Sequence, residues 1–385
     1  MTAAPWVDTS RPKSANQAYF PALDGVRGFA FLLVFVWHYL TLPWAWAGVN
    51  LFFVLSGFLI TGILFDTRDD PHRFRNFYVR RTLRIFPLYY GVILLIVLAY
   101  PMFQWEWNWA WLAWPLYLGN LSHIVRVWTP DSPMARMAFG ELISGRIRGL
   151  MLNLGHFWSL CLEEQFYLFW PCIVFLVRGR KKLIWICAAC VMIEPFLRIA
   201  ASHLLATCVP PDHNALYFVT PFRVDSLLLG GSIALVRRGP AARTLYRGGR
   251  VVFVLCSTAL VVWLALRVGQ HRPGDYVYPL WRNTWGLSLI DIYSASLLLT
   301  ALEPGSPVYR IFNIGPLRWL GRISYGAYVF HNIYIDPVRQ MMRPYGDPSK
   351  LKSTAVGFVI TIVLAWASFR WFESPFIRLK DRWTR

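Results

Sequence analysis

A histidine lies inside a strongly apolar segment near the start of the chain. His38 follows nine apolar residues, from Phe29 to Trp37, and the nearest charged residue on the N-terminal side is Arg27. Ionisable groups are costly inside a membrane and therefore mark candidate functional sites. Since imidazole can accept a proton near neutral pH, His38 is a candidate general base. A buried histidine that only hydrogen-bonds a neighbouring helix is the alternative.

Asp24 and Arg27 stand where the same apolar segment begins. Arg27 and His38 are eleven residues apart, about three helical turns, so in a helix they share one face at different depths. Such a helix can hold an acid or anion contact where it enters the membrane and a titratable imidazole deeper in the membrane.

Three arginines, Arg80, Arg81 and Arg84, precede the apolar segment 85–103. Arg81 and Arg84 are three residues apart, so they share one face of a helix. Two guanidinium groups on one face form a cradle for phosphate oxygens. The alternative is the ordinary excess of positive charge at a cytoplasmic membrane boundary.

The segment 156–171 combines a histidine, a serine and two carboxylates with apolar residues. Ser159 and Glu163 are four residues apart and share a helix face, and His156 lies one turn before Ser159. Glu163 and Glu164, at the head of an apolar segment, are hard to explain as a lipid-facing surface. Direct catalysis and a buried structural ion-pair network are both compatible with this pattern.

Further ionisable residues occur in later apolar segments. Arg223 and Asp225 lie together in one of them, and we expect the two glutamates of the segment 156–171 to pair with them. His331 lies in another apolar segment. Glu373 lies at the end of the last one, where a solvated role is expected.

The elements that carry these residues are membrane helices. The chain is 56% hydrophobic and 15% charged, whereas soluble domains average about 25% charged residues. The segment 85–103 has no charged residue and is long enough to cross a bilayer as a helix. The sequence therefore predicts an all-α polytopic membrane protein with about ten transmembrane helices, at 26–42, 48–65, 85–103, 157–177, 183–203, 216–236, 251–268, 284–302, 320–338 and 353–372.

The net charge of +19 does not indicate nucleic-acid binding, because the Lys and Arg residues form short clusters between the apolar segments. Such clusters face the cytoplasm, and their alternation predicts that both termini are cytoplasmic. We expect a single membrane domain over 1–385, with a polar tail at 1–20 and a long extracytoplasmic or interfacial loop at 104–155. Cys187 and Cys190 lie in an apolar segment without further ligands, so no metal site is expected.

Taken together, these segments resemble the acyltransferase-3 family of integral membrane acyltransferases. Arg27 and His38 match the family's spacing of an arginine, ten residues and a histidine, and Arg81 and Arg84 match its Arg-x-x-Arg motif. Asn50 departs from the pattern, because many members carry Asp there, so no charged role is expected for it. The resemblance covers nearly the whole chain, in the segments 23–30, 48–61, 156–171, 223–230, 320–331 and 371–376.

Members of this family transfer acetyl or other acyl groups from acyl-CoA to extracytoplasmic or lipid-linked acceptors, often sugars of surface polysaccharides. The resemblance implies O-acylation of a carbohydrate or glycolipid hydroxyl at the inner membrane. Acetyl-CoA is the default donor, and no permanently bound cofactor is expected.

The resemblance also implies roles for single residues. Arg81 and Arg84, assisted by Arg80, would bind the phosphates of coenzyme A. His38 would act as general base on the acceptor hydroxyl, or would form a transient acyl-histidine. Asp24 and Glu163 are the further catalytic candidates, and the substrate-binding candidates are Arg27, His156, Ser159, Glu164, Arg223, Asp225 and His331.

A transporter or flippase that uses the buried charges as a substrate path is the alternative function. Transporters tend to have internal repeats and paired broken helices, and neither is visible in the sequence. A sensory or scaffold membrane protein would leave the Arg-x-x-Arg pair and the intramembrane histidine unexplained.

Overall fold

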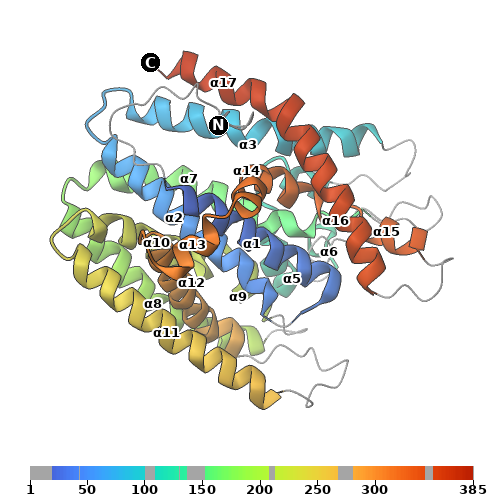
Figure 1. Ribbon diagram of the computed structural model, residues 1–385. Helices are drawn as coiled ribbons and strands as arrows, with labels where there is room; N and C mark the ends of the chain where they lie inside the picture. Colours follow the sequence, from blue (N-terminus) through green and yellow to red (C-terminus); the bar gives the residue numbers. More distant parts are fainter. Residues whose placement is uncertain are drawn as a thin grey trace, which may run out of the picture.

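The protein is an all-α polytopic membrane protein, and the described residues contain no β-strand (Figure 1). The computed structural model describes residues 20–42, 44–99, 109–129, 131–136, 152–207, 213–267, 281–342 and 350–384. The predicted polar tail, apart from Phe20, and much of the predicted loop 104–155 lie outside these ranges.

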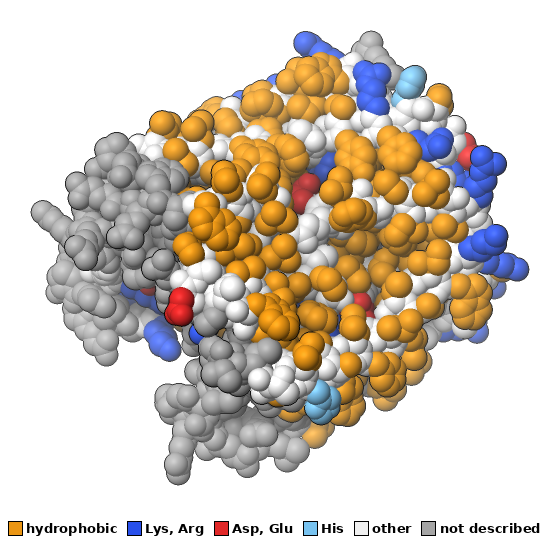
Figure 2. All heavy atoms as spheres, turned by 180° about the vertical axis from the view of Figure 1, so that it is seen from behind, with side chains coloured by type: hydrophobic (Ala, Val, Ile, Leu, Met, Phe, Trp, Pro, Cys, Tyr) orange, Lys and Arg blue, Asp and Glu red, His pale blue; other side chains and the backbone are white. Residues whose placement is uncertain are grey.

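Among the described residues, eight helices are long and apolar enough to cross a membrane. Large hydrophobic side chains such as Leu95, Phe169 and Phe196 are exposed on their outer faces. Figure 2 shows one face of the molecule, on which hydrophobic side chains form a broad surface and Lys and Arg side chains gather mainly along one edge. The eight spans correspond to α1 (Pro21–Leu40), α2 (Gly48–Asp66), α3 (Arg73–Leu98), α7 (Trp158–Leu176), α8 (Arg180–Ala206), α11 (Ala242–Arg267), α12 (Leu287–Ala301) and α16 (Lys350–Ala367).

The other two predicted spans are interrupted helices. The span 216–236 is divided into α9 (Ala215–Phe218), a short 3-10 turn (Thr220–Phe222) and α10 (Val224–Arg237). Pro221 explains this break, because a proline disfavours the helical conformation of the residue before it. The span 320–338 is divided into α14 (Gly315–Phe330) and α15 (Ile335–Met342). The sequence did not predict these breaks, and they occur at Arg223 and His331.

Several basic loops lie at one end of the helix bundle. Arg238, after α10, donates to both carboxylate oxygens of Asp66 at the end of α2, at 2.7 and 2.5 Å. Arg180, at the start of α8, donates to the carbonyl oxygen of Leu235 at 3.0 Å. These contacts place the ends of α2 and α10 and the start of α8 together, as their common cytoplasmic assignment predicts.

Part of the predicted loop 104–155 is folded onto the bundle. Trp111 and Trp114 are buried in the core, whereas Trp109 is 59% exposed. The hydroxyl of Tyr89 on α3 donates to the carbonyl oxygen of Trp114 at 2.7 Å. The described part of this loop therefore packs against the helices that carry the site.

Glycines allow α1 and α14 to approach each other closely. A Cβ atom at Gly321 would lie 1.7 Å from the backbone oxygen of Asp24, and one at Gly28 would lie 2.3 Å from the backbone oxygen of Leu317. Only residues without a side chain fit at these positions. This contact sets the register between the helices that carry His38 and His331.

Gly321→Ala is expected to destabilise the protein by about 1–3 kcal/mol or more, because the clash is with the backbone of another helix. The melting temperature in detergent should fall, and the measurement is a thermal unfolding curve of the purified variant. Gly315→Ala is the matched control, since a Cβ there meets nothing within 4 Å. Equal melting temperatures for the two variants would contradict the prediction.

Candidate functional site

Three histidines from distant parts of the chain meet near the end of α1 that lies away from the basic loops. The rings of His38 and His331 have centroids 4.9 Å apart, and those of His331 and His156 are 4.8 Å apart. His331 is fully buried and His156 is 3% exposed, whereas His38 is only half-buried. Of the three, His38 is therefore the one that a substrate can reach most easily.

The ring of His38 is held through one nitrogen. Its Nδ1 lies 2.9 Å from the carbonyl oxygen of Val34 and 3.3 Å from Nε2 of His331. Within the described residues, Nε2 of His38 makes no hydrogen bond. This atom is available to accept a proton from a substrate.

Tyr328 links the histidines to α7. Its hydroxyl donates to the carbonyl oxygen of His156 at 3.0 Å and also contacts the Ser159 hydroxyl. Ser159 donates to the same carbonyl at 3.2 Å. Ser159 is thus engaged by the protein on both sides, and the geometry favours a structural role over its predicted contact with substrate.

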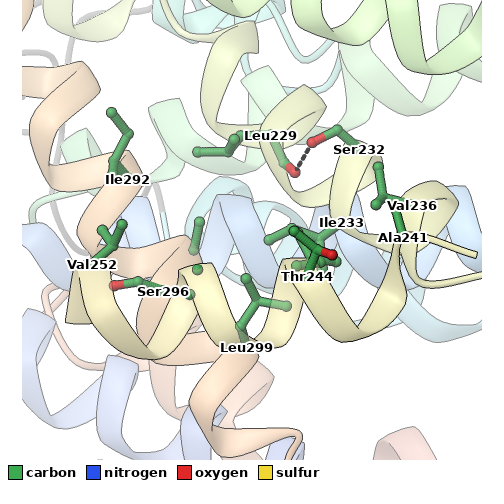
Figure 3. A pocket seen from close by; sticks show the side chains of 14 residues that line it. Leu229, Ser232, Ile233, Val236, Ala241, Thr244, Val252, Ile292, Ser296 and Leu299 are labelled. Carbon is green, nitrogen blue, oxygen red and sulfur yellow. Dashed lines mark hydrogen bonds between the residues drawn. The ribbon is translucent and has the colours of Figure 1, made fainter. Parts of the chain in front are cut away.

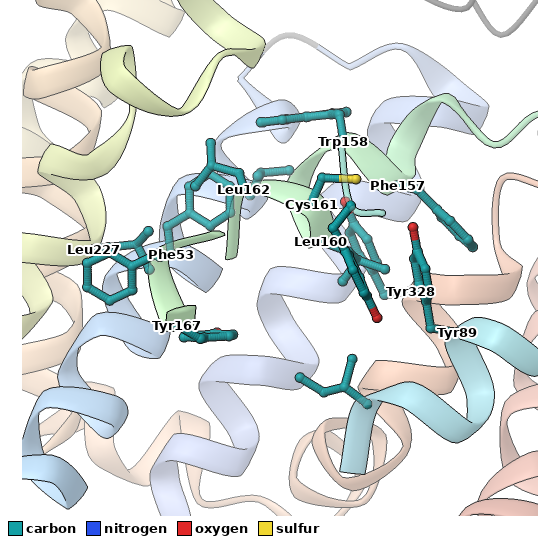
Figure 4. Close-up of a cluster of buried hydrophobic side chains, with 14 of the residues drawn as sticks. Phe53, Tyr89, Phe157, Trp158, Leu160, Cys161, Leu162, Tyr167, Leu227 and Tyr328 are labelled. Atoms are coloured by element: carbon teal, nitrogen blue, oxygen red, sulfur yellow. The ribbon is translucent and has the colours of Figure 1, made fainter. Parts of the chain in front are cut away.

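A hydrophobic core surrounds this link. In Figure 4 the side chains of Trp158, Leu160, Cys161 and Leu162, at the start of α7, lie among those of Phe53 on α2, Tyr89 on α3 and Tyr328 on α14. These contacts fix α7, which carries Ser159 and Glu163 into the bundle.

A second cluster, nearer the basic loops, joins arginines and glutamates. The guanidinium of Arg81 lies 3.6 Å from the centroid of the Tyr167 ring. Glu163 and Glu164, both partly buried, lie within electrostatic range of Arg81, and Glu163 also lies within range of Arg27. The two glutamates of α7 therefore associate with α1 and α3, and their predicted pairing with Arg223 and Asp225 is wrong.

Arg84 extends this cluster to the surface. Its side chain is exposed and lies within electrostatic range of Arg27, Arg81, Asp24 and Glu373. Asp24 and Arg27 form an ion pair at 3.2 Å. Glu373 is 5% exposed, so the solvated role predicted for it is wrong.

Arg80 differs from its two neighbours. Its Nε donates to the hydroxyl of Thr384 at 3.0 Å, beyond the end of α17 (Ser374–Trp383). Arg80 thus contacts the C-terminal segment, and Arg81 lies against α7.

The two clusters lie along one route through the bundle. Arg27 and His38, at opposite ends of α1, are separated by about 16 Å of helix rise. On α14, Tyr325, Tyr328 and His331 recur every three residues and follow the same direction. Tyr325 lies within electrostatic range of Glu164 at one end of this series, and His331 contacts His38 at the other. We call this series of polar side chains, which lie between the Arg81 and Arg84 pair and the histidines, the polar route.

Arg223 belongs to a separate, fully buried network. Its guanidinium donates to the side-chain oxygen of Asn50 at 3.2 Å, and the amide nitrogen of Asn50 donates to Asp291 at 2.6 Å. The guanidinium also lies over the rings of Tyr217 and Phe53, at 4.8 and 5.5 Å from their centroids. Asn50 thus bridges a cation and an anion.

Asp225 forms a neighbouring ion pair. Arg198 of α8 donates to Asp225 at 2.8 Å and to the carbonyl oxygen of Phe222 at 2.9 Å. Ser288 also donates to Asp225, at 3.2 Å. With these partners Asp225 is a structural residue in this geometry.

The sequence interpretation missed Arg198 and Asp291. Both are ionisable residues inside predicted spans, at 183–203 and 284–302, and the cost of burying charge there could have identified them. Their partners could not be found in this way, because the pairing joins α2, α8, α10 and α12.

A cavity of about 400 Å³ lies apart from these clusters, between α10, α11 and α12. Figure 3 shows its lining of aliphatic and small side chains, including Leu229, Ile233 and Leu299. It contains no ionisable side chain and offers no group for acid, base or metal chemistry. In the described part of the chain, no group of three or more His, Cys, Asp or Glu side chains could hold a metal ion.

Comparison with known proteins gives a consistent family. The chain is 29% identical over 382 residues to the putative peptidoglycan O-acetyltransferase YrhL of Bacillus subtilis, covering 94% of this chain and 56% of the relative. It is 29% identical over 388 residues to the peptidoglycan O-acetyltransferase OatA of Listeria monocytogenes, with the same coverage. The chain thus spans a little over half the length of these relatives.

A putative O-acetyltransferase of Staphylococcus aureus, SACOL0978, is 25% identical over 383 residues, which cover 94% of this chain and 58% of the relative. No solved structure matches the chain. Residues 20–370 match the acyltransferase-3 family, described as an acyltransferase domain. The chain therefore belongs to the acyltransferase-3 family of membrane proteins.

Proposed function

We propose that this protein transfers an acyl group, by default acetyl, from acyl-CoA to a hydroxyl of a carbohydrate or glycolipid acceptor. The observation that carries the proposal is the polar route from Arg81 and Arg84 to His38. It joins a cationic site at one end of the bundle to a half-buried imidazole near the other end. The peptidoglycan O-acetyltransferase names of the relatives support O-acetylation and a carbohydrate acceptor.

The donor would bind at the basic end. Arg81 and Arg84 would hold the coenzyme A phosphates through charge-assisted hydrogen bonds, and Arg80 would assist from the neighbouring surface. Asp24 orients Arg27, which lies on the helix face that leads toward His38. Glu163 and Glu164 would position Arg81 and border the path of the pantetheine arm.

The acceptor hydroxyl would meet the thioester at His38. Nε2 of His38 takes the hydroxyl proton as the oxygen attacks the thioester carbonyl; the C–S bond then breaks, and the coenzyme A thiolate takes up a proton. An acyl-histidine formed at the same nitrogen is the alternative path. His156 and Arg223 remain candidates for acceptor contacts, because Nδ1 of His156 and two nitrogens of Arg223 have no partner in the described residues.

A transporter or flippase is the alternative function. The interruptions at Arg223 and His331 are broken helices, which transporters also contain. Membership of an acyltransferase family favours the enzyme.

Binding of labelled acetyl-CoA to the purified protein in nanodiscs tests the donor site. The double variant Arg81→Ala, Arg84→Ala should weaken binding by about 10-fold or more, since hydrogen bonds to charged groups contribute about 1.5–3 kcal/mol. Arg80→Ala, the matched control, should have a smaller effect because its Nε is bound to Thr384. If no acyl-CoA binds to folded wild-type protein, the donor assignment fails and the transporter becomes the better hypothesis.

A further inference from the structure

We propose that His331 is a positioning residue for His38: it accepts the Nδ1 proton of His38, directs Nε2 of His38 toward substrate, and shares the positive charge when His38 is protonated. This inference rests on the proposed function, in which His38 is the general base. It replaces the predicted role of His331 in substrate binding.

The proton positions follow from backbone carbonyl groups, which only accept hydrogen bonds. Nδ1 of His331 lies 2.6 Å from the carbonyl oxygen of Tyr328, so this nitrogen carries the proton and Nε2 is the acceptor. Nδ1 of His38 lies 2.9 Å from the carbonyl oxygen of Val34, so it is a donor. The single Nδ1 proton of His38 is therefore shared between the Val34 carbonyl oxygen, at 2.9 Å, and Nε2 of His331, at 3.3 Å.

His331 is held too firmly to serve as a mobile substrate ligand. Its side chain is fully buried at the end of α14, and both ring nitrogens are engaged by the protein. The hydroxyl of Tyr39 donates to its carbonyl oxygen at 3.2 Å, and the ring of Phe31 packs edge-on with a centroid distance of 6.2 Å. The ring of His331 is therefore a fixed support behind the half-buried ring of His38.

A second imidazole here occupies the position that a carboxylate has behind the histidine of a Ser-His-Asp triad. Within the described residues, neither hydrogen bond of the His38 ring is to a carboxylate. Arg339, which forms an ion pair with Asp336 at 3.9 Å, donates to the His38 carbonyl oxygen at 3.1 Å, so the charged group in direct contact with His38 has the same sign as an imidazolium. The lone pair of His331 Nε2 offsets that repulsion when His38 takes up a proton.

Two substitutions separate this role from packing. Glutamine places an amide oxygen near the position of Nε2, whereas asparagine reaches only the position of Nδ1. His331→Asn should lower kcat about 10- to 100-fold, as loss of a histidine's hydrogen-bond partner does elsewhere, with the KM for acetyl-CoA unchanged. His331→Gln should recover most of the lost rate. Equal rates for both variants and wild type, or better recovery by asparagine, would overturn the inference.

His38→Ala, assayed beside the two His331 variants, tests the role of His38 separately from the role of His331. If His38→Ala retains activity, the proposed function of His38 fails; if it is inactive while both His331 variants act like wild type, only the role of His331 fails. Nitrogen-15 NMR of histidine-labelled wild-type protein gives a readout that needs neither turnover nor variants. Protons on Nδ1 of both neutral rings, which leave Nε2 of His331 as an acceptor, support the inference, and a proton on Nε2 of either ring overturns it.

Discussion

Replacing His38 with alanine is expected to lower the rate of acyl transfer about 10²- to 10⁴-fold, the usual contribution of a general base. The physical reason is that the imidazole is half-buried, bound through Nδ1 and, among the described residues, free at Nε2, which can take the hydroxyl proton. The measurement is release of coenzyme A from acetyl-CoA by purified protein. Binding of acetyl-CoA should persist, because the proposed phosphate site on α3 lies near Arg27, and Arg27 is separated from His38 by about 16 Å of helix rise along α1.

His203→Ala is the matched control, since His203 is exposed on α8 and belongs to neither cluster. Its rate should equal that of the wild type. A His38→Ala enzyme with normal turnover would show that another group removes the proton. Mass spectrometry after incubation with donor alone separates the two chemical paths, because only the acyl-histidine path leaves an acyl group on His38.

Asp291→Asn is expected to destabilise the protein by at most about 3–5 kcal/mol, the cost of removing one partner from a direct buried ion pair, because the Asn50 amide lies between Asp291 and Arg223. Arg223 is fully buried, and Asp291 neutralises it through the Asn50 amide, with contacts of 3.2 and 2.6 Å. Asn50→Asp is also destabilising, because two carboxylates at this separation cannot both be ionised. The double variant Asn50→Asp, Asp291→Asn restores one carboxylate beside the arginine and should recover most of the lost stability.

The measurement is a double-mutant cycle on the free energy of unfolding in detergent. Each single variant should lose stability, and the coupling energy between the two substitutions should be stabilising. If the losses of stability were additive, a carboxylate at position 50 could not replace the one at position 291. The cycle also tests whether a carboxylate at position 50, where many acyltransferase-3 proteins have Asp, can take the place of the Asp291 carboxylate on α12.

The candidate residues could be found one by one in the sequence, because each is an ionisable group inside an apolar segment or at its boundary. His38, the Arg81 and Arg84 pair and Glu163 all lie on the polar route, and Arg27 lies on the face predicted for it. Their partners could not be found in this way. Glu163 associates with Arg81 and not Arg223, and His331 supports another histidine, since pairing depends on which helices touch.

Sequence periodicity also could not predict which of the helices are interrupted. The segments 216–236 and 320–338 are apolar enough to suggest simple spans, yet both break where a polar side chain is presented to a neighbouring helix. Hydropathy averages over a window and does not register one turn of irregular backbone.

Composition, charge clusters and motif spacing were sufficient for the membrane class, the family resemblance and the candidate base, because these depend on local residue type and on helix geometry. The tertiary structure decided which nitrogen of His38 is free, which residue lies behind it and which carboxylate neutralises Arg223. These are contacts between residues up to 293 positions apart, and they arise only when glycine-mediated packing brings α1 against α14 and α2 against α10.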